Sequence, residues 1–222
     1  MGTLYVAEQI STGAQRALKL INHDLLLDEK VRTRFAQEAR IGGLIESDHV
    51  VQVIQAGVDE ATTLPFLAME LLKGEDLARH LAENGAMPLD QVALISEQLC
   101  HALSAAHAVG VVHRDLKPEN IFLATSRRAG LPFMVKVLDY GVAKIIAEAR
   151  ATTTGAIGTP LFMAPEQAMT GDDIGPHTDV WALGLIVFRM LTGLYFWRMA
   201  TQGKSLVDLM REVTMSPLMR AS

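Results

Sequence analysis

Three side chains of complementary chemistry stand close together in the stretch HRDLKPEN. Asp115, Lys117 and Asn120, a carboxylate, an amine and an amide, lie within six residues. A carboxylate can accept a proton, a lysine can bind phosphate, and an amide oxygen can bind a hard cation. The segment is therefore a candidate for base, phosphate-contact and metal-ligand roles. A polar surface turn is the alternative for these residues taken alone.

A further acidic residue follows at the end of an apolar run. In VKVLDYGVAK, Asp139 comes nineteen residues after Asn120 and is followed by Tyr140 and Gly141. A carboxylate at a strand end beside a glycine turn can serve as a Mg²⁺ ligand, because this ion prefers carboxylate oxygens and keeps several waters. An Asx-type turn that binds no metal is the alternative.

Two charged residues lie on faces that the sequence pattern predicts to be buried. Lys19 shares a strand face with Ala17, and Glu38 shares a helix face with Val31 and Phe35. Since lysine and glutamate are rarely buried unless they are paired, we predict an ion pair between Lys19 and Glu38. Two separate solvated charges, one at a strand edge and one on a helix flank, are the alternative.

The elements that must position these residues change type along the chain. Two short apolar runs, Leu4–Ala7 and Ala17–Ile21, flank a polar turn and predict a β-hairpin. Two more strands are expected before Leu72, and helical periodicity dominates after it. We therefore expect two lobes, residues 1–72 and 73–222, with a ligand cleft between them.

Length, charge and cysteine content narrow the class of protein. A chain of 222 residues can bury a large core without disulfides. Its single cysteine, Cys100, is expected to be a small core residue and favours a reducing compartment, which we take to be the cytoplasm. The net charge of −5 does not suggest nucleic-acid binding. The longest apolar stretch, Val180–Phe188, is too short to span a bilayer, and the N-terminus lacks a signal-peptide pattern.

The candidate motifs occur in a characteristic order. A strand lysine and a helix glutamate are followed by HRDLKPEN, DYG, GTPLFMAPE and DVWALG. Together they resemble the eukaryotic-type protein kinase family over essentially the whole chain, and its bacterial serine/threonine branch in particular. The resemblance implies an α+β fold with a small antiparallel β lobe, which holds one helix, and a larger, mainly helical lobe.

The resemblance also implies an activity and a role for each motif residue. The activity is transfer of the γ-phosphate of ATP to serine and threonine hydroxyls of proteins in a signalling role. Lys19 would hold the α- and β-phosphates, and Glu38 would orient it. Asp115 would accept the proton of the substrate hydroxyl, and Lys117 would contact the γ-phosphate. Asp179 would brace the catalytic loop through its backbone.

A nucleotide site between the lobes is implied in the same way. The implied Mg²⁺ ligands are Asn120 and Asp139. The implied adenine pocket has Leu4 and Ala17 in its roof, Phe122 in its floor, Met69 as gatekeeper, and Glu70 and Leu72 lending backbone hydrogen bonds. Ordinary core packing is the alternative for the apolar members of this set.

The loop before APE bears on substrate class and regulation. Thr159 in GTP, like Lys117 two residues after the catalytic aspartate, resembles the serine/threonine branch. The resemblance implies that Arg114 pairs with a phosphorylated loop residue. We therefore predict autophosphorylation at Thr152 or Thr154, with self-association as one route. A polar loop without phosphate is the alternative.

The sequence departs from the family pattern at both ends. The first strand and two glycines of the phosphate loop would precede Gly2, and the arginine that normally pairs with Glu166 would follow the last residues. We therefore expect a domain truncated at both ends, with Glu166 lacking its partner and the chain less stable than a full kinase domain. The alternative function is that of a catalytically impaired fragment or pseudokinase that acts as a binding module. A small-molecule kinase is disfavoured by the complete GTPLFMAPE segment.

Overall fold

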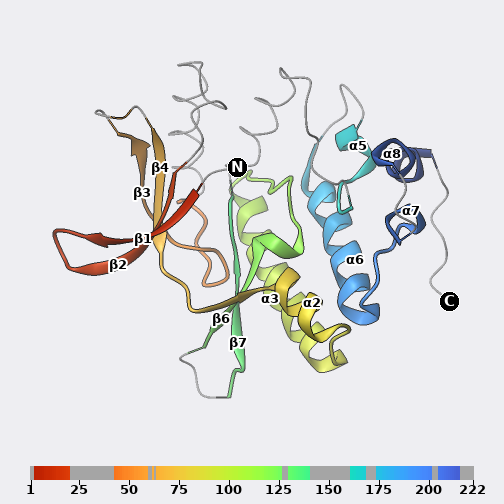
Figure 1. Ribbon diagram of the computed structural model, residues 1–222, viewed down its shortest axis with the longest axis horizontal. Coiled ribbons are helices and arrows are strands. Elements are labelled where there is room, and N and C mark those ends of the chain that lie inside the picture. Colours follow the sequence, from red (N-terminus) through yellow and green to blue (C-terminus); the bar gives the residue numbers. More distant parts are fainter. Residues whose placement is uncertain are drawn as a thin grey trace.

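A strand-rich part and a helix-rich part of the chain lie next to each other (Figure 1). The computed structural model describes residues 3–20, 43–59, 62, 64–126, 130–140, 161–168, 174–201 and 205–215. The expected α+β architecture with two lobes is confirmed. The helix predicted around Glu38 lies outside the described residues, and the lobe boundary at residue 72 stays a prediction.

The first lobe contains one antiparallel sheet. Its strands are β1 (Thr3–Gln9), β2 (Ala14–Leu20), β3 (Val53–Val58) and β4 (Pro65–Glu70), in the order β1-β2-β4-β3. The β1–β2 turn is closed by the N–H groups of Thr12 and Gly13, which donate to the carbonyl of Gln9. Gly13 has a φ of 67°, which glycine adopts without steric cost. The predicted hairpin is confirmed.

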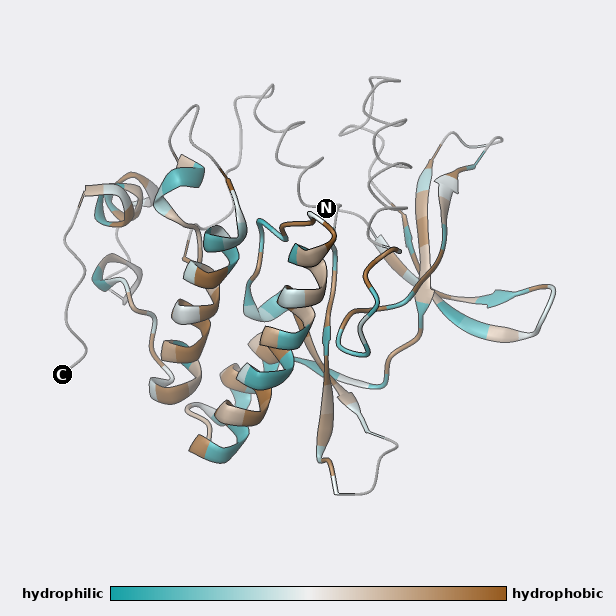
Figure 2. Ribbon diagram, turned by 180° about the vertical axis from the view of Figure 1, so that it is seen from behind, coloured by the Kyte–Doolittle hydropathy of each residue, from teal (hydrophilic) through white to brown (hydrophobic). Residues whose placement is uncertain are grey.

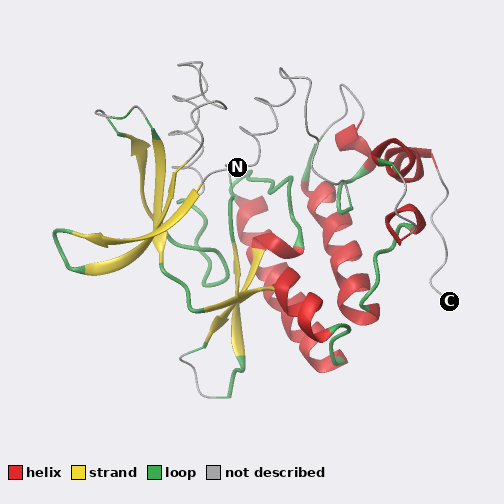
Figure 3. Cartoon of the chain, viewed as in Figure 1, coloured by secondary structure: helices red, strands yellow, loops and turns green. Residues whose placement is uncertain are grey.

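The second lobe combines a small sheet with helices (Figure 3). Its strands are β5 (Gly74–Asp76), β6 (Ile121–Thr125) and β7 (Phe133–Val137), in the order β5-β6-β7. Its helices are α2 (Leu77–Asn84), α3 (Leu89–Ala108), α5 (Pro165–Ala168), α6 (Pro176–Thr192), α7 (Arg198–Thr201) and α8 (Leu206–Met215), with a short 3₁₀ helix, η2 (Pro118–Asn120).

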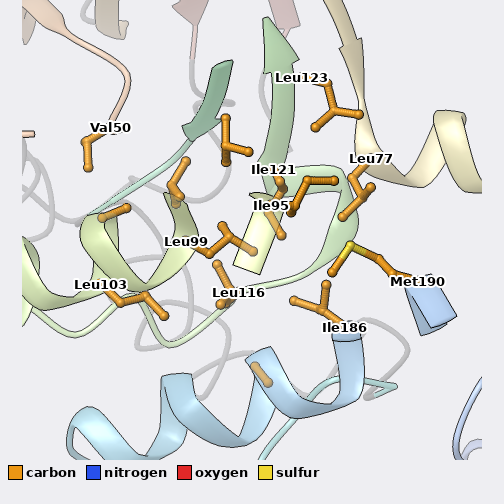
Figure 4. Packing of buried hydrophobic residues seen from close by; sticks show 14 of the residues in the cluster. Val50, Leu77, Ile95, Leu99, Leu103, Leu116, Ile121, Leu123, Ile186 and Met190 are labelled. Atoms are coloured by element: carbon orange, nitrogen blue, oxygen red, sulfur yellow. The ribbon is translucent and has the colours of Figure 1, made fainter. Parts of the chain in front are cut away.

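The core of the second lobe lies between α3, α6 and the small sheet. Apolar and polar residues alternate along both helices at helical spacing (Figure 2). The buried stripe of α3 comprises Val92, Ile95, Leu99, Ala102, Leu103 and Ala106. It meets Ile186 and Met190 of α6 and Ile121 of β6 in one cluster (Figure 4). Each buried leucine or isoleucine stabilises the fold by about 1.5–3 kcal/mol.

Two sequence expectations about these helices have different outcomes. The apolar stretch Val180–Phe188 forms part of α6, and no described helix is long and apolar enough to cross a membrane. Cys100, expected in the core, is instead exposed. It follows Leu99, which points into the core, and consecutive helical residues are about 100° apart around the axis. That rotation turns Cys100 toward solvent.

The two lobes are joined by backbone and side-chain contacts near the connecting segment. The N–H of Val51 donates to the carbonyl of Val137 (3.0 Å), and the N–H of Val137 donates to the carbonyl of His49 (2.8 Å). Lys136 Nζ lies 2.7 Å from Glu70 Oε1, so β7 is also tied to the end of β4. These contacts fix the first sheet against the strand that leads to Asp139.

Candidate active site

A buried carboxylate on α6 holds the loop that carries Asp115. Asp179 is 1% exposed, and its Oδ2 and Oδ1 accept hydrogen bonds from the backbone N–H groups of His113 and Arg114, both at 2.9 Å. Asp179 Oδ2 also lies 2.7 Å from His107 Nε2, which comes from α3. Arg114 has a φ of 67°, a left-handed conformation that is uncommon for residues other than glycine. Asp179 therefore braces this loop through its backbone, as the resemblance implied.

Asp115, Lys117 and Asn120 form one hydrogen-bonded group. Lys117 Nζ lies 2.7 Å from Asp115 Oδ2. Asn120 Nδ2 donates to the backbone carbonyl of Asp115 at 2.7 Å and lies 3.3 Å from its Oδ2. Asn120 closes η2, which turns its side chain back toward Asp115. The Asp115 side chain is 51% exposed, so a substrate hydroxyl can reach this carboxylate from solvent.

Lys19 contacts Asp139 directly. Its Nζ lies 2.6 Å from both Oδ1 and Oδ2 of Asp139, across the space between the two lobes. The N–H of Leu138 donates to the carbonyl of Asn120 (2.9 Å), which places the end of this strand beside the Asp115 group. The lysine, both acids and the amide therefore belong to one site. The predicted partner Glu38 lies outside the described residues, so the Lys19–Glu38 pair stays a prediction.

Behind Asp139, Tyr140 and His113 pack against each other in the interior. Their rings form an edge-to-face pair with centroids 4.8 Å apart. His113 Nδ1 accepts from the N–H of Asp115, so Nε2 carries the proton and donates to the carbonyl of Leu138 at 2.9 Å. The Tyr140 hydroxyl is buried and meets no hydrogen-bond partner in the described structure. Burial, aided by the negative charge of Asp179, raises the pKa of Tyr140 well above its ordinary value, so this group stays neutral.

Substituting Tyr140 with phenylalanine is expected to increase the free energy of unfolding by about 1 kcal/mol. The ring contact with His113 is kept, while a buried hydroxyl that costs about 1–3 kcal/mol when it is unpaired is removed. Urea unfolding monitored by fluorescence measures the change. Tyr5→Phe is the matched control, because Tyr5 is 50% exposed and should change stability little. A destabilised Tyr140→Phe variant would contradict this interpretation of the hydroxyl.

Half of the implied adenine pocket, three of its six residues, is found in one apolar cluster. Ala17 and Met69 are buried together, and Leu72 packs against them. Phe122 stands opposite Lys136 on the β6–β7 ladder, on the face from which Lys136 reaches Glu70. This face of the small sheet is therefore turned toward the connecting segment, as a pocket floor requires.

Two implied pocket residues differ from the rest. Leu4 is 63% exposed and stands opposite Lys19 on the β1–β2 ladder, at the open side of the sheet. The Glu70 N–H is already engaged, since it donates to the carbonyl of Gln52 (3.0 Å).

Residues 161–168, which include APE, are fixed to the loop that carries Asp115 and to the segment that follows α6. Gln167 Nε2 donates to the carbonyl of Arg114 at 2.6 Å, and Trp197 Nε1 donates to the carbonyl of Leu161 at 2.9 Å. Gln167 was not identified from the sequence as a positioning residue. The sequence signal that could have identified Gln167 was its position directly after the APE motif.

Glu166, expected to lack the arginine partner of the family pattern, has other polar partners among the described residues. Glu166 Oε1 accepts from Thr178 Oγ1 at 2.7 Å and lies 3.5 Å from His177 Nε2. The side chain is also only partly buried, so no isolated charge is enclosed. Both partners lie in the first turn of α6, which brings them next to α5. The predicted phosphorylation sites Thr152 and Thr154, and also Thr159, lie outside the described residues.

Comparisons with solved structures agree with this architecture. Crystal structures of the PknI kinase domain of Mycobacterium tuberculosis superpose with a TM-score of 0.70 at 24% identity. One of them covers 89% of this chain and 70% of that chain. At this level of identity, the similarity concerns the fold.

Comparisons with curated sequences identify bacterial relatives. Serine/threonine-protein kinase Pkn1 of Myxococcus xanthus is 41% identical over 198 residues, covering 87% of this chain and 27% of the relative. Pkn3 of the same organism is 38% identical, and PknB of Mycobacterium leprae is 33% identical. The chain spans about 27–36% of the length of these three relatives. The sequence pattern of the protein kinase domain matches residues 1–220, and the chain therefore belongs to the protein kinase family.

Proposed function

We propose that this chain transfers the γ-phosphate of ATP to serine or threonine hydroxyls of protein substrates in a signalling role. The observation that carries the proposal is the meeting of Lys19 and Asp139 from the two lobes beside the Asp115–Asn120 group. Phosphoryl transfer requires little covalent chemistry from the enzyme. It requires positioning and compensation of phosphate charge, for which these groups are suited.

The side chains of the site fit a magnesium ion held together with nucleotide phosphates. The described residues contain no cluster of three or more His, Cys, Asp or Glu side chains placed to hold a metal. The Asp139 carboxylate and the Asn120 amide oxygen would supply two oxygen ligands, and Mg²⁺ in such sites takes the rest from phosphate and water. When bound, the ion neutralises charge on the phosphates.

The two lysines would change partners during the reaction. Lys19 and Lys117 each lie within 2.7 Å of a carboxylate that the reaction requires. Phosphate oxygens compete for both ammonium groups, which would release Asp139 to the metal and Asp115 to the substrate. Apolar groups around Ala17 and Met69 would receive the adenine ring.

The chemical step uses Asp115 as the base. Its carboxylate accepts the proton of the substrate hydroxyl while that oxygen forms a bond to the γ-phosphorus. The bond from the γ-phosphorus to the β–γ bridging oxygen breaks, and its electron pair leaves with ADP. Lys117, two residues from the base, would neutralise charge on the γ-phosphate.

Labelled ATP tests the proposal. We expect Mg²⁺-dependent transfer of labelled phosphate to serine and threonine peptides, and not to the tyrosine equivalents. Asp139→Ala should reduce transfer at a fixed low Mg²⁺ concentration by at least about 10- to 100-fold, since removing even a group that supports a metal ligand has an effect of this size. Equal transfer by the parent and this variant would overturn the enzyme assignment and favour a binding module.

Two further parts of the proposal concern regulation and location. Autophosphorylation at Thr152 or Thr154, with Arg114 receiving the phosphate, stays a prediction that phosphopeptide mapping of the same reaction mixture reports. ATP as the phosphate donor and a free thiol at Cys100 support a reducing compartment rich in nucleotide, and so we place the reaction in the cytoplasm.

A further inference from the structure

Arg189, in the last turn of α6, carries buried donors that the fold leaves unpaired. Its Nε and Nη1 atoms are buried and meet no hydrogen-bond acceptor in the described structure. Its Cζ lies 3.7 Å from the centroid of the Tyr195 ring. This cation–π contact offsets part of the cost of burying the charge, but a ring beneath the guanidinium plane accepts none of its in-plane N–H groups. The guanidinium is thus held in place, and its Nε and Nη1 meet no anion among the described residues.

Contacts through Tyr195 and Phe162 connect Arg189 to the loop that carries Asp115. The Tyr195 ring lies 6.3 Å, centroid to centroid, from the ring of Phe162. Phe162 belongs to the described segment 161–168, and Gln167 of this segment donates to the carbonyl of Arg114, the residue before Asp115. Residues 161–168 therefore contact both the residue before Asp115 and the Tyr195 ring, and we call this segment the wall.

A peptide whose hydroxyl reaches Asp115 must extend past this wall. An extended peptide advances about 3.3–3.6 Å per residue, so residues a few positions from the acceptor would pass Phe162 and Tyr195. We propose that Arg189, positioned by Tyr195, selects substrates with an aspartate or glutamate near the phosphorylated residue. The inference rests on the proposed function and names its substrate class.

The chemistry at Arg189 favours a carboxylate over other side chains. Guanidinium N–H groups form short, strong hydrogen bonds with carboxylates, and these gain strength where water is excluded. A neutral amide would satisfy the donors without compensating the charge. A basic substrate residue would be repelled by the buried cation. Acidic residues should therefore be preferred at one or two positions of the peptide.

Paired peptides test this preference. A serine peptide is made with glutamate or glutamine at each position from five residues before the acceptor to four after it, and kcat/KM is measured for each pair. We expect the parent to prefer glutamate by about tenfold at one or two positions, as for a hydrogen bond to a charged group. Arg189→Met should abolish the preference, and Arg189→Lys should retain part of it. Arg79→Met is the matched control, because Arg79 is an exposed arginine paired with Glu83 on α2 and should leave the ratio unchanged.

Two further measurements distinguish a peptide-binding role of Arg189 from a purely structural role. They also distinguish failure of this inference from failure of the proposed kinase function. Arg189→Met should unfold at a urea midpoint no lower than the parent, since it removes two buried N–H groups that meet no acceptor among the described residues. If no peptide is phosphorylated, fluorescence anisotropy with the same labelled peptides still measures binding, and the glutamate peptide should bind the parent more tightly than its glutamine partner. No preference in either assay, or a preference that survives in Arg189→Met, would overturn the inference.

Discussion

Replacing Asp115 with asparagine is expected to reduce kcat by about 10²- to 10⁴-fold, the usual contribution of a general base. Asparagine keeps the size of the side chain and can still accept from Lys117 and Asn120, but it cannot take up the proton of the substrate hydroxyl. The Asp115 side chain is half exposed, so the substitution should change the free energy of unfolding little. Steady-state phosphorylation of a serine peptide at saturating Mg-ATP measures kcat, and urea unfolding measures stability.

The control for this experiment is Asp90→Asn. Asp90 is an exposed acid in the first turn of α3, away from the Asp115 group, so its neutralisation should leave kcat unchanged. If a variant had a lower kcat only because less of it was folded, its urea midpoint would also be lower than that of the parent. If Asp115→Asn kept more than a tenth of the parent kcat while remaining folded, the assignment of Asp115 as the base would be wrong.

Replacing Asp179 with alanine should produce the largest loss of stability of any substitution considered. Its carboxylate is 1% exposed and accepts from the N–H groups of His113 and Arg114 and contacts His107. Removing it leaves several buried donors unpaired, and we expect the free energy of unfolding to fall by about 3–5 kcal/mol. Since small domains are stable by only about 5–15 kcal/mol, much of the total would be lost.

A comparison with a surface carboxylate makes this result interpretable. Asp76 caps α2 by accepting from the N–H of Arg79, and its replacement by alanine should cost about 0.5–2 kcal/mol. Asp179→Asn retains one acceptor oxygen, so it should fold even if Asp179→Ala does not, and its loss should lie between the other two. A loss for Asp179→Ala no greater than that for Asp76→Ala would show that the loop is held by other contacts.

Local patterns in the sequence were sufficient for much of the fold. The β1–β2 hairpin and the buried stripe of α3 depend on alternation and helical spacing, which neighbouring residues define. Cys100 was misplaced because its prediction followed the usual burial of free cysteine and not its angular position next to Leu99 on α3. The contacts of Glu166 with Thr178 and His177 could not be predicted from the sequence, because these residues approach it only when α5 packs beside the start of α6.

Residue type and motif order in the sequence were sufficient to predict which residues would carry the chemistry, namely Lys19, Asp115, Lys117, Asn120 and Asp139. The tertiary structure decided which of them meet. Lys19 contacts Asp139 over a separation of 120 residues, and Arg189 stacks on Tyr195 with two donors that meet no acceptor in the part of the chain that the structure describes. The physical reason is that partner choice in a buried site depends on distance, desolvation and available acceptors. These quantities exist only after distant segments have packed together.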